Sequence, residues 1–339
     1  MPESSSAGAA PAALARVRPL LPWLSLGVGI ASALVMDRGP KRAAVVAGAA
    51  VLLWATLIAL RLMARVELAD DARPWRRRLL ALLHRSSLMA TQSLVQLALF
   101  FALPFYVQAA VLDAGHVAFV VVLGALCVVA LWDPLSARML RSTLAAPLLP
   151  VMASFVALTA VLPGLGLSIE QSLWLASAIA GAGTVLTAAL GVAAAQRRAV
   201  LVAAVVAALV VPLALHLGAA RVVPAAPLRL VEAAIGTRRE GKWVGGVATR
   251  FESAPERLVC ATAIFSPVGV RDRLFHLWHK DGVQRARIAL EFRGGRGQGF
   301  RTQSRIQLGP HERGTYRCTV VTAAGQLLGS TEVHVGTGR

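Results

Sequence analysis

Charged residues are scarce in this sequence. Only 15% of its 339 residues are charged, whereas 56% are hydrophobic; a soluble domain usually contains about a quarter charged residues. The apolar residues between positions 20 and 217 form repeated runs of about 20 residues, the length that crosses a bilayer as an α-helix. Hydrocarbon offers no water to the backbone, so such a run must close its own hydrogen bonds as a helix does. The composition excludes an ordinary soluble protein and predicts a membrane all-α bundle in contact with the lipid bilayer.

We expect about seven transmembrane helices. Arg16 and Arg18 precede the first apolar run, as in a secretory signal, but six further runs follow, so we interpret it as a signal anchor. The predicted spans are residues 20–36, 43–63, 88–111, 117–132, 144–165, 172–195 and 199–217.

Acidic residues are also few, 17 against 35 basic ones, which gives a net charge of +18. Such a charge could indicate nucleic-acid binding, but the basic residues before position 222 lie in the short gaps between apolar runs, as topology signals do. We therefore expect no nucleic-acid partner. With the N-terminus in the cytoplasm, four basic residues fall on the outer side: Arg38, Lys41, Arg42 and Arg221. Thirteen fall on the cytoplasmic side: Arg16, Arg18, Arg61, Arg65, Arg73, Arg76, Arg77, Arg78, Arg85, Arg138, Arg141, Arg197 and Arg198.

An odd number of crossings places the C-terminal region outside the cytoplasm. We predict a cytoplasmic tail (1–19), a transmembrane domain (20–217), a juxtamembrane linker (218–256) with a short helix near 228–235, and a periplasmic β-domain (257–339). The last region has short β-branched and aromatic runs separated by turn signals, of which Asp281-Gly282 suits a tight hairpin. Their number favours an immunoglobulin-like sandwich over a barrel. The predicted strands are residues 258–265, 273–280, 283–292, 300–308, 315–322 and 327–335.

Four segments of the C-terminal region resemble a bacterial family known only as domain of unknown function 2914. They read RLVCATAIFSP (257–267), LFHLWHKDG (274–282), RIALEFRGGRGQGFRTQSR (287–305) and GTYRCTVVTAAGQLLG (314–329). The run QSLVQLALFFALPFYVQA (92–109) is similar to the membrane region that often precedes this domain in uncharacterised inner-membrane proteins. The resemblance implies a fold and an inner-membrane location, and no known activity.

Polar residues inside the spans are rare, and no Lys, Arg, Asp or Glu lies in the middle of a span. Gln92, Ser93 and Gln96 are close together on the third span, with both glutamines on one helix face. Such groups usually bond across helices; the alternative is a ligand or ion path. Pumps and ion-coupled carriers tend to need intramembrane charges, so a transporter or channel-like bundle with the β-domain as its regulator is the second interpretation. Asp133-Pro134 is expected to end a helix.

The candidate ligand site lies in the β-domain. His276 and Trp278 share one face of a strand, and Phe275 and Leu277 share the other, which we expect to face the core. His276 and Trp278 would then be partly exposed near Arg293, Arg296 and Arg301. A Trp beside several arginines could hold an anionic or sugar-like ligand. The alternative is a packing Trp beside solvated arginines. His276 and His279 point to opposite faces, so we expect no metal site, and nothing indicates a cofactor.

Cysteine occurs three times. Cys127 lies within a span and is expected to pack there. Cys260 and Cys318 lie on separate predicted strands in a compartment that we expect to be oxidising, so we hypothesise a disulfide that bridges the two sheets. The sequence does not show whether their Cα atoms come close enough for the bond. The glycine-rich run 294–300 leads into a strand, which excludes a phosphate-binding helix start. No set of residues has catalytic spacing. We predict a non-enzymatic protein whose β-domain binds a periplasmic or envelope ligand or partner.

Overall fold

The computed structural model has a bundle of helices followed by a β-sheet domain. It describes residues 40–65, 74–142, 145–191, 222–266, 270, 272–290, 292 and 299–336, together with scattered residues between 198 and 213. The predicted first span (20–36) lies outside the described residues, as does much of the predicted seventh (199–217).

Among the described residues, five helices are long and apolar enough to cross a membrane. They correspond to five predicted spans, and the total of seven stays a prediction. The helices are α3 (Pro40–Met63), α4 (Pro74–Ala109), α5 (Ala114–Leu131), the short α6 (Asp133–Arg141), α7 (Leu148–Val161) with the 3-10 turn η2 (Leu162–Leu165), and α8 (Ile169–Gly191).

Helix α4 is much longer than the apolar run that predicted it. It has 36 residues, about 54 Å at 1.5 Å per residue, whereas the hydrocarbon core is about 30 Å thick. The added turns at its N-terminus contain Arg76, Arg77, Arg78 and Arg85. A hydropathy boundary therefore falls where the charges begin, although the backbone stays helical beyond it.

Two helix ends follow from local sequence. Pro134 lies in the first turn of α6, where its missing N–H costs nothing, so Asp133-Pro134 marks a helix terminus as predicted. Ser168 and Gln171 form a capping box at the start of α8. The backbone N–H of Gln171 donates to Ser168 Oγ at 3.1 Å, and the backbone N–H of Ser168 donates to the side-chain Oε1 of Gln171 at 2.9 Å. Such reciprocal bonds satisfy two amides that the helix leaves free.

All six predicted strands are present. They are β5 (Arg257–Phe265), β6 (Leu274–Lys280), β7 (Val283–Leu290), β8 (Phe300–Gln307), β9 (Gly314–Thr322) and β10 (Leu327–Val335). Asp281 and Gly282 have φ values of 50° and 83° and join β6 to β7. Positive φ at both central residues is what the tight hairpin requires.

The short helix predicted near 228–235 is wrong, because this segment is strand β1 (Arg229–Gly236) and pairs antiparallel with β5. The small residues of the segment lowered its β signal, and pairing with β5 decides its conformation. Three more strands lie in the predicted linker: β2 (Arg238–Glu240), β3 (Trp243–Gly245) and β4 (Arg250–Phe251). The β-domain thus includes part of the segment expected to be a linker.

The β-domain contains a three-stranded sheet in the order β1-β5-β8 and a five-stranded sheet in the order β4-β10-β9-β6-β7. Side chains from both sheets share the buried clusters between them, for example Leu258 on β5 and Val333 on β10. A small hairpin, β2–β3, forms a separate ladder. The immunoglobulin-like topology stays a prediction.

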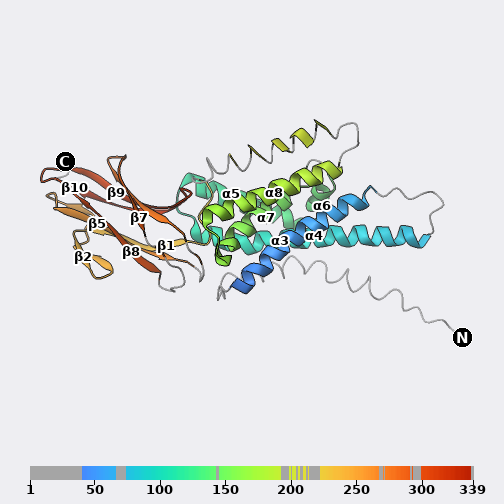
Figure 1. Ribbon diagram of the computed structural model, residues 1–339, viewed down its shortest axis with the longest axis horizontal. Helices are drawn as coiled ribbons and strands as arrows, with labels where there is room; N and C mark the ends of the chain where they lie inside the picture. Colours follow the sequence, from blue (N-terminus) through green and yellow to red (C-terminus); the bar gives the residue numbers. More distant parts are fainter. Residues whose placement is uncertain are drawn as a thin grey trace.

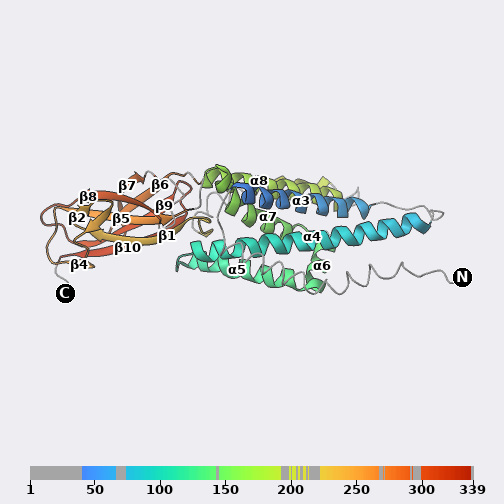
Figure 2. The same ribbon diagram turned by 90° about the horizontal axis from the view of Figure 1, so that it is seen from below.

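The β-domain lies at one end of the bundle, and its strands run along the same long axis as the helices (Figures 1 and 2). Ile169 at the start of α8 belongs to a buried cluster with Leu228 and Leu274. Its amide donates a hydrogen bond of 3.2 Å to Asp272 Oδ2, and Gln326 donates one of 3.0 Å to the Val223 carbonyl. The junction is therefore both packed and hydrogen-bonded.

Candidate functional site

A pocket of about 630 Å³ opens on the outer face of the three-stranded sheet. Four of its lining residues are arginines with exposed side chains: Arg238, Arg239, Arg257 and Arg305. The remaining lining residues are Thr237, Val259, Gln303 and Ser304.

The hairpin β2–β3 forms one wall of this pocket. Trp243 and Val244 pack against Val259 and Ala261 on the outer face of β5, which holds the hairpin over the sheet. Gly236 has no side chain for a structural reason, because a Cβ there would press against the Gly245 carbonyl. This close approach positions Arg238 and Arg239 above the sheet.

Strands β5 and β8 form the other wall. Their antiparallel register pairs Val259 with Arg305 and Arg257 with Gln307, so both arginines belong to the outer face at the same end of the sheet. Gln303, on the same face of β8, donates a hydrogen bond of 2.7 Å to the Trp243 carbonyl and ties the two walls together.

The pocket has a large excess of positive charge. Arg257 has one acidic neighbour, Glu256, at 3.5 Å, and both side chains are exposed to solvent. Within the described part of the chain, Arg238 and Arg305 make no ion pair with a carboxylate. Arginine offers a planar set of donors that suits phosphate and carboxylate groups, so the lining of the pocket offers donors of the kind that an anion requires.

The predicted exposure of His276 and Trp278 is wrong. The two side chains do share a face of β6, but that face is the core, and both have 0% relative exposure. Phe275 and Leu277 take the partly exposed face, where the Arg287 guanidinium lies 4.0 Å from the Phe275 ring centroid. The prediction assumed that the more apolar pair must be buried, whereas the core offers polar partners to His276 and Trp278.

Those partners form a closed network. Ser304 Oγ lies 2.7 Å from His276 Nδ1 and accepts a 2.9 Å hydrogen bond from Trp278 Nε1. Thr262 Oγ1 lies 3.0 Å from His276 Nε2. Burial lowers the pKa of His276 to about 4, so the ring is neutral at physiological pH.

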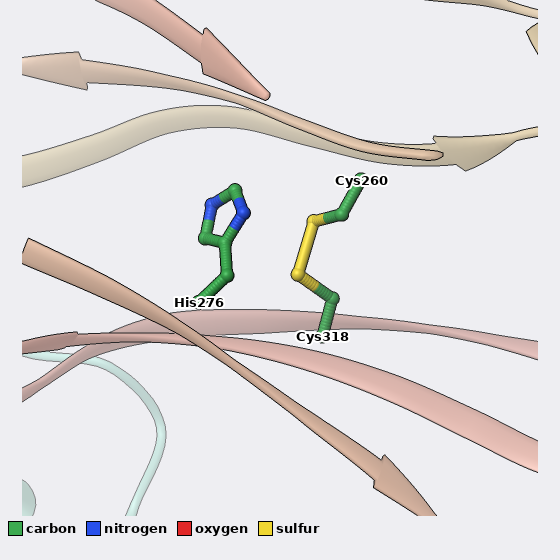
Figure 3. A group of neighbouring side chains, drawn as sticks. All are labelled: Cys260, His276 and Cys318. Carbon is green, nitrogen blue, oxygen red and sulfur yellow. A yellow bond between two sulfur atoms is a disulfide. The ribbon is translucent and has the colours of Figure 1, made fainter. Parts of the chain in front are cut away.

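A disulfide joins Cys260 on β5 to Cys318 on β9 and thereby links the two sheets, with a Cα–Cα distance of 6.5 Å. His276 lies beside it (Figure 3), and the potential ligand atoms of the three residues are within 4.8 Å of one another. Metal ions bind cysteine as the thiolate. The sulfur atoms of the disulfide are bonded to each other, so this group acts as a cross-link with a neighbouring histidine.

The remaining predicted ligand residues are distributed differently. Arg301 is on the outer face of β8, where its guanidinium lies 5.2 Å from the ring centroid of Trp243, beside the pocket. Arg293 and Arg296 lie outside the described residues. The structure therefore brings Arg301, and neither His276 nor Trp278, to an arginine-rich surface.

The polar residues of α4 connect helices. Gln92 donates a 2.8 Å hydrogen bond to Ser136 Oγ on α6, and Gln96 donates one of 2.8 Å to the Ala130 carbonyl on α5. Both glutamines are buried, whereas Ser93 is half-buried. The two amides thus join α4 to its neighbours. Cys127 is a free, buried cysteine on α5.

The four pocket arginines were missed because they meet only through the pairing of strands. Arg238 and Arg239 are followed by Gly241, which has a φ of 59° at the hairpin turn, and this turn signal could have revealed the hairpin. The meeting of Arg257 and Arg305 requires β5 and β8 to be neighbours, which no local pattern indicates.

Fold and site define a helical bundle of membrane-spanning length joined to a β-domain with an arginine-lined pocket. Residues 5–242 match the Family of unknown function (DUF5924), which is well over half of the chain, and the chain belongs to this family. Residues 271–335 match the Protein of unknown function (DUF2914), which confirms the resemblance of the C-terminal segments. No curated protein matches the chain.

The two matches meet at the pocket. The DUF5924 match ends at residue 242 and contains Arg238 and Arg239, whereas Arg305 lies in the DUF2914 match. Arg257 falls between the two. The pocket is therefore built from both matched regions.

Proposed function

We propose that this chain is a non-enzymatic bacterial inner-membrane protein that displays a ligand-binding β-domain on the periplasmic side. The observation that carries the binding role is the pocket with four arginines and one acidic neighbour. Its ligand is an anion of the cell envelope, held by charge-assisted hydrogen bonds.

The orientation rests on where the basic residues lie along the bundle. Helix α6, the C-terminal end of α3 and the N-terminal extension of α4 lie at the end of the bundle opposite the β-domain (Figure 1). These segments, with the residues that directly follow α3, contain Arg61, Arg65, Arg138 and Arg141 and the arginines of the α4 extension. The described links at the β-domain end, residues 110–113 and 162–168, contain no Lys or Arg, and the start of α3 adds Lys41 and Arg42 at that end. Basic residues resist translocation, so the arginine-rich end belongs in the cytoplasm and the β-domain outside it.

Cysteine labelling tests the orientation. Val283, on the β-domain, and Leu82, in the α4 extension, are 67% and 61% exposed. In intact spheroplasts, a membrane-impermeant maleimide should label Val283→Cys and should label Leu82→Cys only after the membrane is permeabilised. The reverse pattern would refute the periplasmic location.

Binding is tested with inorganic pyrophosphate and the full chain in detergent micelles. Calorimetry should show binding that weakens with added salt and that falls by about tenfold in Arg257→Gln/Arg305→Gln, which removes the arginines of one wall. Arg317→Gln is the matched control, since Arg317 is an exposed arginine of the other sheet paired with Glu332. Equal binding by all three proteins would show that the pocket is not the site.

A further inference from the structure

The pocket lies at the end of the β-domain that is farthest from the bundle. Strand β1 begins beside the buried cluster at the junction and ends at Gly236, directly before the pocket residue Thr237. Its 8 residues span about 26 Å at roughly 3.3 Å per residue. Both views place β2 at the tip of the molecule, away from the helices (Figures 1 and 2).

This distance separates the pocket from the membrane that would hold the bundle. A headgroup layer adds about 5 to 7 Å on each side of the hydrocarbon core, and electrostatic effects of a charged surface decay over about 10 Å at 0.1 M salt. A pocket about 25 Å beyond the helix ends is out of reach of headgroups in that bilayer.

The charge of the pocket is divided between its two walls. Arg238 and Arg239 belong to the hairpin wall, and Arg257 and Arg305 belong to the sheet wall. Glu256 is near one of the four. A single small anion can pair with one wall and leaves the other unneutralised. The volume of about 630 Å³ falls in the usual range for small-molecule sites and exceeds the size of one phosphate.

We infer that the ligand is a soluble anion with at least two separate phosphate-like groups, one for each arginine wall, and not a lipid of the membrane around the bundle. This inference rests on the proposed anion-binding function and names the ligand class for the same site. Arginine binds such groups through paired hydrogen bonds, and two groups on one ligand use both walls at once.

The experiment compares orthophosphate, pyrophosphate and tripolyphosphate by calorimetry, with the full chain in nanodiscs of phosphatidylcholine. Affinity should rise by about tenfold for each added phosphate until both walls are occupied, the change that one further charge-assisted hydrogen bond can supply. Arg238→Gln/Arg239→Gln and Arg257→Gln/Arg305→Gln should each flatten this series. Arg317→Gln should preserve it.

A second arm replaces phosphatidylcholine by anionic phosphatidylglycerol. Unchanged tripolyphosphate affinity supports a soluble ligand. Weaker tripolyphosphate binding in the anionic bilayer would show that its lipids compete for the pocket, and it would overturn the inference that the ligand is soluble. Equal affinity for all three phosphates overturns the requirement for two groups and leaves the proposed anion site intact. Absence of binding to any of them overturns both the inference and the proposed function.

Discussion

His276 Nδ1 and Ser304 Oγ lie 2.7 Å apart in the core of the β-domain, where they connect the two sheets. The Thr262 hydroxyl lies 3.0 Å from the other ring nitrogen, His276 Nε2. Hydroxyl groups both donate and accept, so either neutral tautomer of the ring is fully hydrogen-bonded. A protonated ring would have the same hydrogen-bond partners but none of the hydration that a charged imidazole has in water, so protonation in the core is costly.

The stability of the β-domain should therefore fall in acid. Folding lowers the pKa of His276 from 6.5 to about 4, so the folded state disfavours the proton that the unfolded chain accepts. The contribution of the neutral His276 to the free energy of unfolding is fully present above pH 6.5. Below that pH this contribution should decline by about 1.4 kcal/mol per pH unit, and the decline should level off near pH 4.

Thermal melting of the full chain in micelles, followed by the β-sheet signal in circular dichroism, measures this decline. His276→Gln keeps hydrogen-bonding capacity without titrating there, so its melting temperature should depend less on pH. His311→Gln, at an exposed position, should behave as wild type. Identical pH dependence in all three proteins would show that His276 does not contribute.

Removing the disulfide should destabilise the β-domain strongly. Cys260 and Cys318 are 58 residues apart in sequence, and closing a loop of that length stabilises a fold by about 4 kcal/mol. Cys260→Ala/Cys318→Ala should melt well below wild type. Cys127→Ala, which removes a free buried sulfur and no cross-link, should lower the melting temperature much less. Mass spectrometry of the non-reduced protein that found free thiols at both positions would contradict the disulfide.

Regular patterns made much of the fold predictable. Runs of the right length predicted the helices, and β-branched runs bounded by turn residues predicted β5 to β10. Strand β1 was predicted as a helix because Ala233, Ala234 and their neighbours have weak β preference. Its conformation comes from pairing with β5, a contact between segments distant in sequence.

The site was less predictable because it depends on which face of a strand is buried. Alternation along β6 correctly separated His276 and Trp278 from Phe275 and Leu277, but a period of two cannot say which face is inside. Hydrophobicity suggested the wrong one, since Ser304 on a distant strand supplies the polar partner. The arginine pocket requires a hairpin lying across a sheet, which is a tertiary arrangement.

Asp272 should contribute to docking of the β-domain on α8. Its Oδ2 accepts the 3.2 Å hydrogen bond from the Ile169 amide, one of the amides that a helix start leaves without a partner. Asp272→Ala should weaken the first turn of α8 by about 1 kcal/mol, measured as faster hydrogen exchange of its amides. Asp272→Asn keeps an acceptor oxygen and should retain most of the protection. Loss in the Asn variant equal to that in the Ala variant would contradict an acceptor role.

Gly183 should be required for the packing of α8 against α3. A Cβ at this position would overlap the ring of Trp54, which is 6% exposed and belongs to a buried cluster. Gly183→Ala must therefore displace the Trp54 ring or part the two helices, at a cost of about 1 to 3 kcal/mol. The matched change is Gly124→Ala on α5, where an added Cβ meets no atom within 4 Å and alanine favours the helix. Melting in micelles should separate the two variants, with Gly183→Ala below wild type and Gly124→Ala at or above it. Equal melting of both would mean that the ring of Trp54 yields without cost, and that close contact with the glycine is not what holds α3 to α8.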